Sequence, residues 1–112
     1  NQMKNLLFCL MLTTLSATSQ IENIQGTWES IESQCLTAIS YNKKEFKFKN
    51  ICDSNIIETV VNKGKDFVTT TLINTDNNHK VVIKYTLLDN GNLQGNFIGD
   101  YKGIIIHRRY NE

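Results

Sequence analysis

The chain has 112 residues, with 12 Lys plus Arg against 11 Asp plus Glu, a formal net charge of +1 and no proline. Apolar residues make up 40% of the sequence, which is typical of a folded protein and not of a linker or a disordered tail. The length excludes a multidomain enzyme, and the balanced charge gives no indication of a polyanionic partner. We therefore expect one small folded domain.

The first 19 residues have the pattern of a secretory signal peptide. We take Met3 as the start; a basic residue follows it, and then the apolar run Leu6–Leu12 has the length of a signal-peptide core. We expect cleavage after Ser19, which makes residues 1–19 the signal peptide and residues 20–112 a domain secreted from, or held in the periplasm of, a bacterial cell. The apolar run is too short to cross roughly 30 Å of hydrocarbon. The alternative is an uncleaved anchor helix.

Two cysteines remain in the exported part, Cys35 and Cys52. An even number of cysteines in an exported chain predicts a disulfide. Closing this loop would add about 3 kcal/mol of stability in the chain-entropy model. The alternative is two separate buried thiols.

The exported part is predicted to consist of strands. No stretch keeps an apolar period of 3.6 residues, whereas Val, Ile, Thr, Tyr and Phe form short runs between Asn, Asp and Gly. The predicted strands, in chain order, are Thr27–Glu32, Cys35–Tyr41, Glu45–Ile51, Asn55–Asn62, Asp66–Asn74, Lys80–Leu88, Asn92–Ile98 and Tyr101–Tyr110. Ile21–Gln25 is interpreted as a helical turn or an extended lead-in. Connections of two to five residues are too short for crossover helices. We therefore predict an all-β fold, an eight-stranded antiparallel up-and-down β-barrel.

The alternation of side chains predicts how the hairpins pair. In the first hairpin, Ile39 lies opposite Phe48 when the two cysteines face each other. In the hairpin that contains Gly91, a three-residue loop with positive φ at this glycine places Tyr85 opposite Gly95. Each register gathers the apolar residues on one face.

The last hairpin is predicted to turn through the two residues Gly99 and Asp100, as a type II′ turn. The face that carries Ile104 and Arg108 then points into the barrel. Tyr101, Ile105, His107 and Arg109 are expected to point outward.

The triplet Gly26-Thr27-Trp28 resembles the G-x-W start of lipocalins, fatty-acid-binding proteins and avidins. The resemblance implies a lipocalin-like barrel in which Trp28 closes one end and an Arg of the last strand, here Arg108, packs across it. The order of Trp28, Cys35 and Cys52 is also similar to that of small periplasmic inhibitors of secreted metallopeptidases. In that family the N-terminal segment, here Gln20–Asn23, enters the peptidase cleft.

The sequence contains little catalytic or metal-binding chemistry. His79 and His107 are far apart and no zinc-binding pattern accompanies them, so we predict no metal site, no cofactor and no catalytic residue. Glu29, Glu32 and Glu58 are interpreted as solvated charges on strand faces. We therefore predict a protein that is not an enzyme.

Two function classes remain. The first is a carrier of a small apolar ligand, indicated by a cavity of roughly 300 Å³ or more. Its expected lining at the open barrel end is Tyr41, Phe46, Phe48, Tyr85 and Phe97. The second is an inhibitor or interaction module that binds a protein through its loops or N-terminal segment. The basic hairpin tip puts its lysines and phenylalanines on opposite faces, so we expect no nucleic acid partner, and no membrane contact after signal cleavage.

Overall fold

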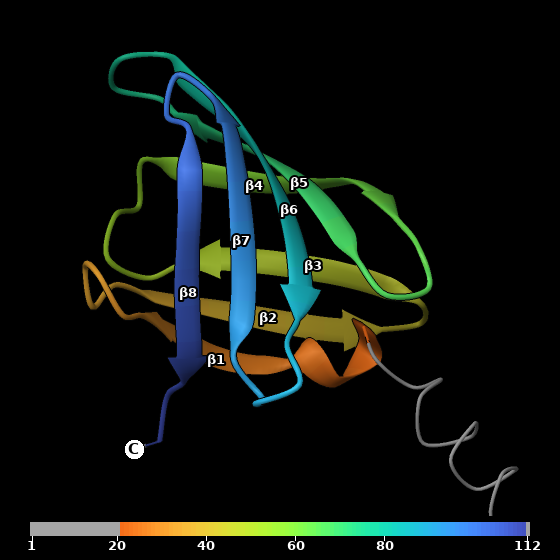
Figure 1. Ribbon diagram of the computed structural model, residues 1–112. Coiled ribbons are helices and arrows are strands. Elements are labelled where there is room, and N and C mark those ends of the chain that lie inside the picture. Colours follow the sequence, from red (N-terminus) through yellow and green to blue (C-terminus); the bar gives the residue numbers. More distant parts are fainter. Residues whose placement is uncertain (1–20, 112) are drawn as a thin grey trace, which may run out of the picture.

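The computed structural model describes residues 21–111, so the predicted signal peptide lies outside the described residues. The elements in chain order are the 3-10 helix η1 (Ile21–Ile24) and the strands β1 (Gly26–Ser30), β2 (Leu36–Asn42), β3 (Glu45–Asn50), β4 (Ile56–Lys63), β5 (Val68–Asn74), β6 (His79–Leu87), β7 (Leu93–Gly99) and β8 (Gly103–Arg109) (Figure 1). All eight predicted strands are present. Among these residues, no helix has the length and apolar character needed to cross a membrane.

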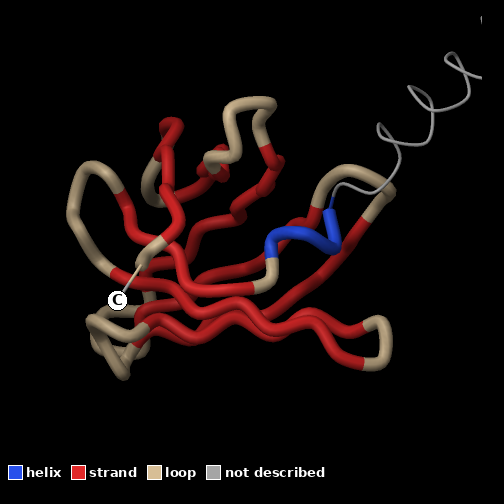
Figure 2. Tube along the Cα trace, turned by 90° about the horizontal axis from the view of Figure 1, so that it is seen from below, coloured by secondary structure: helices blue, strands red, loops and turns tan. Residues whose placement is uncertain are grey.

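The eight strands form one antiparallel sheet that curls into a nearly closed barrel. Its order is β3-β2-β1-β8-β7-β6-β5-β4, so the first and last strands of the chain pair with each other. The two outermost strands, β3 and β4, lie side by side, yet no ladder joins them in the part of the chain that the structure describes. We call this place the β3–β4 seam. Figure 2 shows the strands arranged around a common interior, with η1 across one end. The predicted all-β barrel is confirmed.

The core forms because alternate side chains of each strand point into the barrel. In β6, for example, Val81, Ile83 and Tyr85 are buried, and the two residues that separate them are exposed. The helix η1 adds Ile24 to this core, and Ile24 is completely buried. Its carbonyl oxygen accepts a hydrogen bond of 2.7 Å from Nε1 of the buried Trp28. The helix and Trp28 therefore close one end of the barrel together.

Two of the three predicted hairpin registers are confirmed. Ile39 lies opposite Phe48, and Tyr85 lies opposite Gly95. The loop that joins β6 to β7 contains Gly91 with a φ of 90°, a conformation that a residue with a Cβ rarely adopts. Because each register buries one consistent face, the alternation was sufficient to predict it.

The predicted register of the last hairpin is wrong by one residue. Gly95 lies opposite Ile105, not Ile104, so every side chain of β8 exchanges faces. The reason is that β7 continues its pairing with β6 past the predicted turn: Gly99 pairs with Val81, and the Asp100 backbone N–H donates to the Lys80 carbonyl oxygen at 3.1 Å. The chain therefore reverses in a longer loop.

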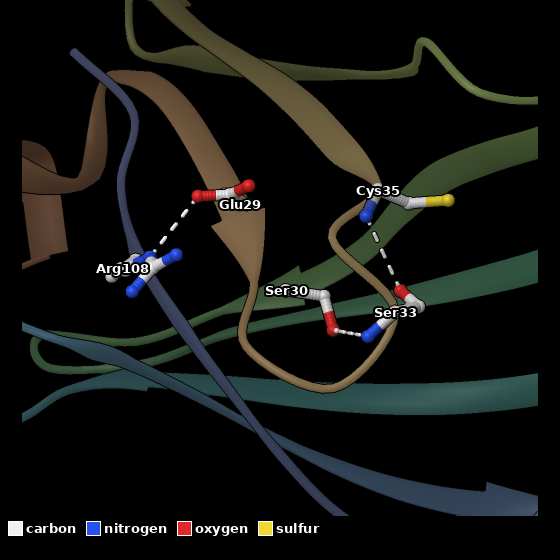
Figure 3. A network of polar contacts seen from close by, with 5 residues as sticks. All are labelled: Glu29, Ser30, Ser33, Cys35 and Arg108. Carbon is white, nitrogen blue, oxygen red and sulfur yellow. Dashed lines mark hydrogen bonds and ion pairs between the residues drawn. The ribbon is translucent and has the colours of Figure 1, made fainter.

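This shift changes which arginine covers the indole. Arg109, and not Arg108, lies over Trp28, with 4.4 Å from the guanidinium carbon to the ring centroid. Its guanidinium also donates to the carbonyl oxygens of Gln25, at 2.8 Å, and Asn23. Arg108 points away from the barrel interior. On the outside of the barrel its Nε lies 3.0 Å from a carboxylate oxygen of Glu29 (Figure 3).

Cys35 and Cys52 lie close together at the end of the barrel opposite η1. Both are free thiols in the structure, and Cys52 is exposed. Interaction with the Cys52 side chain, followed by burial, raises the pKa of the Cys35 thiol. The Cys35 backbone N–H donates to the Ser33 hydroxyl at 3.3 Å, which fixes the approach to β2 (Figure 3). The disulfide stays a prediction.

Candidate functional site

In the part of the chain that the structure describes, no helix crosses the end of the barrel opposite η1, which we call the open end; one hollow lies at this end and another follows the β3–β4 seam. The hollow along the seam has a volume of about 710 Å³, and we call it the seam hollow. Its lining residues come from β2, β3, β4 and the loop between β3 and β4, and they are Ala38, Phe48, Lys49, Asn50, Ile51, Ser54, Ile56, Ile57 and Glu58. Most of these side chains are apolar, but two polar groups, Asn50 and Glu58, belong to inward-facing positions. The hollow exists because β3 and β4 do not pair.

Glu58 is a buried carboxylate, with 8% of the residue exposed. Its Oε2 accepts hydrogen bonds from the Tyr85 hydroxyl at 2.6 Å and from the Thr70 hydroxyl at 2.7 Å. Its Oε1 accepts one bond of 3.0 Å from Nδ2 of Asn50, across the seam. Three neutral donors from three different strands therefore hold the carboxylate, and the bond from Asn50 links β3 to β4 where no backbone ladder does. The prediction that Glu58 is a solvated surface charge is wrong.

Burial governs the proton affinities in this cluster. Desolvation raises the pKa of Glu58, although the donors Tyr85, Thr70 and Asn50 each favour the ionised form and oppose the shift. Desolvation and the neighbouring Glu58 charge raise the pKa of Tyr85 well above its ordinary value. The Tyr85 hydroxyl therefore keeps its proton and acts as a hydrogen-bond donor to the carboxylate.

His107 is a second buried polar residue of the interior. It was predicted to face outward, but the register of β8 turns it inward, and 6% of the residue is exposed. Its ring centroid lies 6.1 Å from that of Tyr85. Burial lowers the pKa of His107, which favours the neutral ring. Its Nδ1 is buried without a hydrogen-bond partner among the described residues.

The five aromatic residues predicted to line one ligand site are spread over three places. Phe48 and Tyr85 stack with ring centroids 5.1 Å apart, and Phe48 lines the seam hollow. Tyr41 and Phe46 pack at 4.5 Å nearer the η1 end, where Phe46 lines a separate hollow of about 520 Å³. Phe97 lines a third hollow of about 220 Å³ at the open end.

The seam hollow and the third hollow are neighbours. Both are lined by Ile56, the first inward-facing residue of β4. The third hollow is largely apolar, with Leu72, Val81 and Phe97 on its walls. An elongated molecule in the seam hollow could therefore extend past Ile56 into an apolar environment.

The polar cluster was missed because the sequence of β4 does not distinguish its two faces. Ile56, Glu58 and Val60 alternate with Ile57, a threonine and another valine, so each face carries two aliphatic residues. The feature of the sequence that indicated a buried Glu58 is its position between two aliphatic residues on the same face of the strand.

Neither a metal site in the described residues nor a known relative indicates what the seam hollow binds. Within residues 21–111, no three His, Cys, Asp or Glu side chains are placed to hold a metal ion. Neither a family of proteins, nor a functionally characterised protein, nor a solved structure matches this chain. The barrel and the seam hollow are therefore the features that indicate a function.

Proposed function

We propose that this protein is a secreted or periplasmic lipocalin-like barrel that binds a small, mostly apolar molecule in the seam hollow, without catalysing a reaction. The observation that carries the proposal is the hollow itself. Its volume of about 710 Å³ is within the range of roughly 300–1,000 Å³ typical of small-molecule sites. An apolar lining with a few convergent polar groups is also typical of such sites.

The closed end of the barrel supports the same proposal. Trp28 and Ile24 are completely buried at that end, and the Arg109 guanidinium covers the indole. A ligand would therefore enter through the open end or the seam. Such an arrangement suits a carrier, because the fold can stay rigid at one end while the other end exchanges its ligand.

The alternative of an inhibitor that inserts its N-terminal segment receives less support. Ile21 is buried, with 6% exposed, and the Asn23 carbonyl oxygen accepts a hydrogen bond from Arg109. Both contacts hold the start of the described chain against the barrel. A segment held in this way would have to detach before it could enter a peptidase cleft.

The proposal can be tested with the fluorescent apolar probe N-phenyl-1-naphthylamine and the exported chain, residues 20–112, after delipidation. We expect the wild-type protein to enhance the probe's fluorescence. Ala38→Trp places a large ring at the rim of the seam hollow and should abolish the enhancement. Asn96→Trp adds the same ring at an exposed position of β7 and should leave it unchanged. Absence of enhancement in the wild type, or equal enhancement in both variants, would refute the proposed site.

A further inference from the structure

Glu58 is unusual among the charged residues at positions 21–111 because it is buried without a cation. Among residues 21–111 the only ion pair within 4.0 Å joins Arg108 to Glu29, on the outside of the barrel. Within the described part of the chain, no basic group contributes to the pKa of Glu58; its partners are the neutral donors Asn50, Thr70 and Tyr85. Buried carboxylates normally have a charged partner or several strong donors. Here the donors are present and the opposite charge is absent.

Among the described residues, the hydrogen bonds to Glu58 leave one acceptor position of the carboxylate unused. A carboxylate oxygen has two lone pairs. Oε2 uses both of its lone pairs, on Tyr85 and Thr70, whereas Oε1 accepts a single bond, from Asn50. Because Asn50 and Glu58 both line the seam hollow, the second lone pair of Oε1 belongs to the part of the cluster that a ligand could reach.

The surroundings of this acceptor favour a donor with a positive charge. The inward-facing polar groups at the hollow are the Glu58 carboxylate and the Asn50 amide, whose NH₂ group already donates to Glu58. Phe48 lines the same wall, and the faces of aromatic rings attract cations. The cation of the lining, Lys49, lies on an outward-facing position of β3 opposite Ala38, at the rim. A ligand with a carboxylate or phosphate group would be repelled by the negative charge of Glu58, whereas an ammonium group would neutralise that charge.

We infer that the ligand of the seam hollow is an amphipathic amine: a molecule with a protonated amino group that donates to Oε1 of Glu58 and an apolar body that lies along Phe48 and Ile56. This inference rests on the proposed function, and it adds the chemical class of the ligand. A charge-assisted hydrogen bond in a partly dry site is stronger than a neutral one. The amine therefore supplies the charge that the barrel interior lacks.

Three eight-carbon probes that differ in the polar group test the inference: octylamine, 1-octanol and octanoate. Titrations of the isotopically labelled exported chain, followed by the amide resonances of Phe48, Asn50 and Glu58, give a dissociation constant for each. We expect octylamine, protonated at neutral pH, to bind at least about tenfold more tightly than 1-octanol. Octanoate should bind more weakly than either.

The variant Glu58→Gln keeps the size of the side chain and removes its charge. We expect the preference for octylamine over 1-octanol to disappear in this variant and to persist in Glu22→Gln, which removes an exposed carboxylate on η1. A preference that survives in Glu58→Gln would overturn the inference. Should this variant not fold, the carboxyl ¹³C resonance of Glu58 in the wild type provides a second measurement. Octylamine should shift this resonance more strongly than 1-octanol, whose hydroxyl is a neutral donor. An unchanged resonance with bound octylamine, or equal shifts by the two probes, would also overturn the inference.

The outcomes separate the inference from the proposed function. Equal affinity for octylamine and 1-octanol, or tighter binding of octanoate, refutes the amine and leaves the hollow as an apolar site. If none of the three probes perturbs the resonances of Phe48, Asn50 and Glu58, both the inference and the proposed site are wrong.

Discussion

Replacing Arg109 by alanine should destabilise the protein by about 2 kcal/mol, whereas the same change at Arg108 should cost less than about 1 kcal/mol. The Arg109 guanidinium lies 4.4 Å from the centre of the Trp28 ring, and an exposed cation–π contact contributes about 0.5–1 kcal/mol. It also donates to the carbonyl oxygens of Gln25 and Asn23, at roughly 0.5–1.5 kcal/mol each. Arg108 makes one ion pair with Glu29, and 56% of the Arg108 side chain is exposed. Surface pairs of this kind contribute roughly 0–1 kcal/mol.

Urea denaturation of the two variants and the wild type measures this difference directly. For a domain of this size, 1 kcal/mol corresponds to a shift of about 4–8 °C in Tm, so thermal melting can also resolve it. Arg109→Lys provides a control, because it retains the charge but not the planar group that donates to two carbonyls at once. Equal losses in Arg108→Ala and Arg109→Ala would mean that the two side chains are equivalent, and the register of β8 described above would then be wrong.

Three further predictions concern other parts of the barrel. Lys44 has a φ of 65° in the β2–β3 turn, a conformation that glycine adopts more readily than lysine, so Lys44→Gly should stabilise the protein by about 1 kcal/mol in urea denaturation. Lys47→Gly, within β3, should destabilise it, and the opposite signs would contradict this account of the turn. Under oxidising conditions Cys35→Ser should lower Tm by several degrees, because we predict a disulfide between Cys35 and Cys52. The disulfide would be excluded if the variant had the same Tm as reduced wild type and both wild-type thiols titrated as free. Because the pKa of Glu58 is raised above 4.5, the folded state holds the carboxyl proton more tightly than the unfolded state, so the contribution of Glu58 to stability falls as pH rises through the window above 4.5. The stability of Glu58→Gln relative to wild type should therefore increase between pH 4 and pH 7, and a constant difference would contradict the burial of the carboxylate.

The alternation of side chains was enough to predict the strands, but it failed where the length of a turn decides the register. Ile39 and Phe48 pair as predicted because each belongs to a strand with one clearly apolar face. In β8, Ile104, Ile105 and Ile106 are consecutive, so both faces are apolar and the alternation fits either register. The decision depends on how far β7 stays paired with β6, a property of three strands that no local pattern contains. A shift of one residue then exchanges the roles of all residues in β8.

The location of the proposed site has a related physical origin. A barrel of eight strands that closed completely would have an interior just wide enough for its own side chains. Here the ladder between β3 and β4 is absent from the described residues, and a side-chain hydrogen bond from Asn50, the last residue of β3, to Glu58 joins the two strands. The same carboxylate is therefore both a link between the strands and the polar group that a ligand would meet. A ligand that binds to Glu58 would contact the residue that links β3 to β4. Binding should therefore stabilise these two strands against opening more than any other pair of neighbouring strands. Hydrogen exchange at the backbone amides of β3 and β4 should slow when the ligand binds.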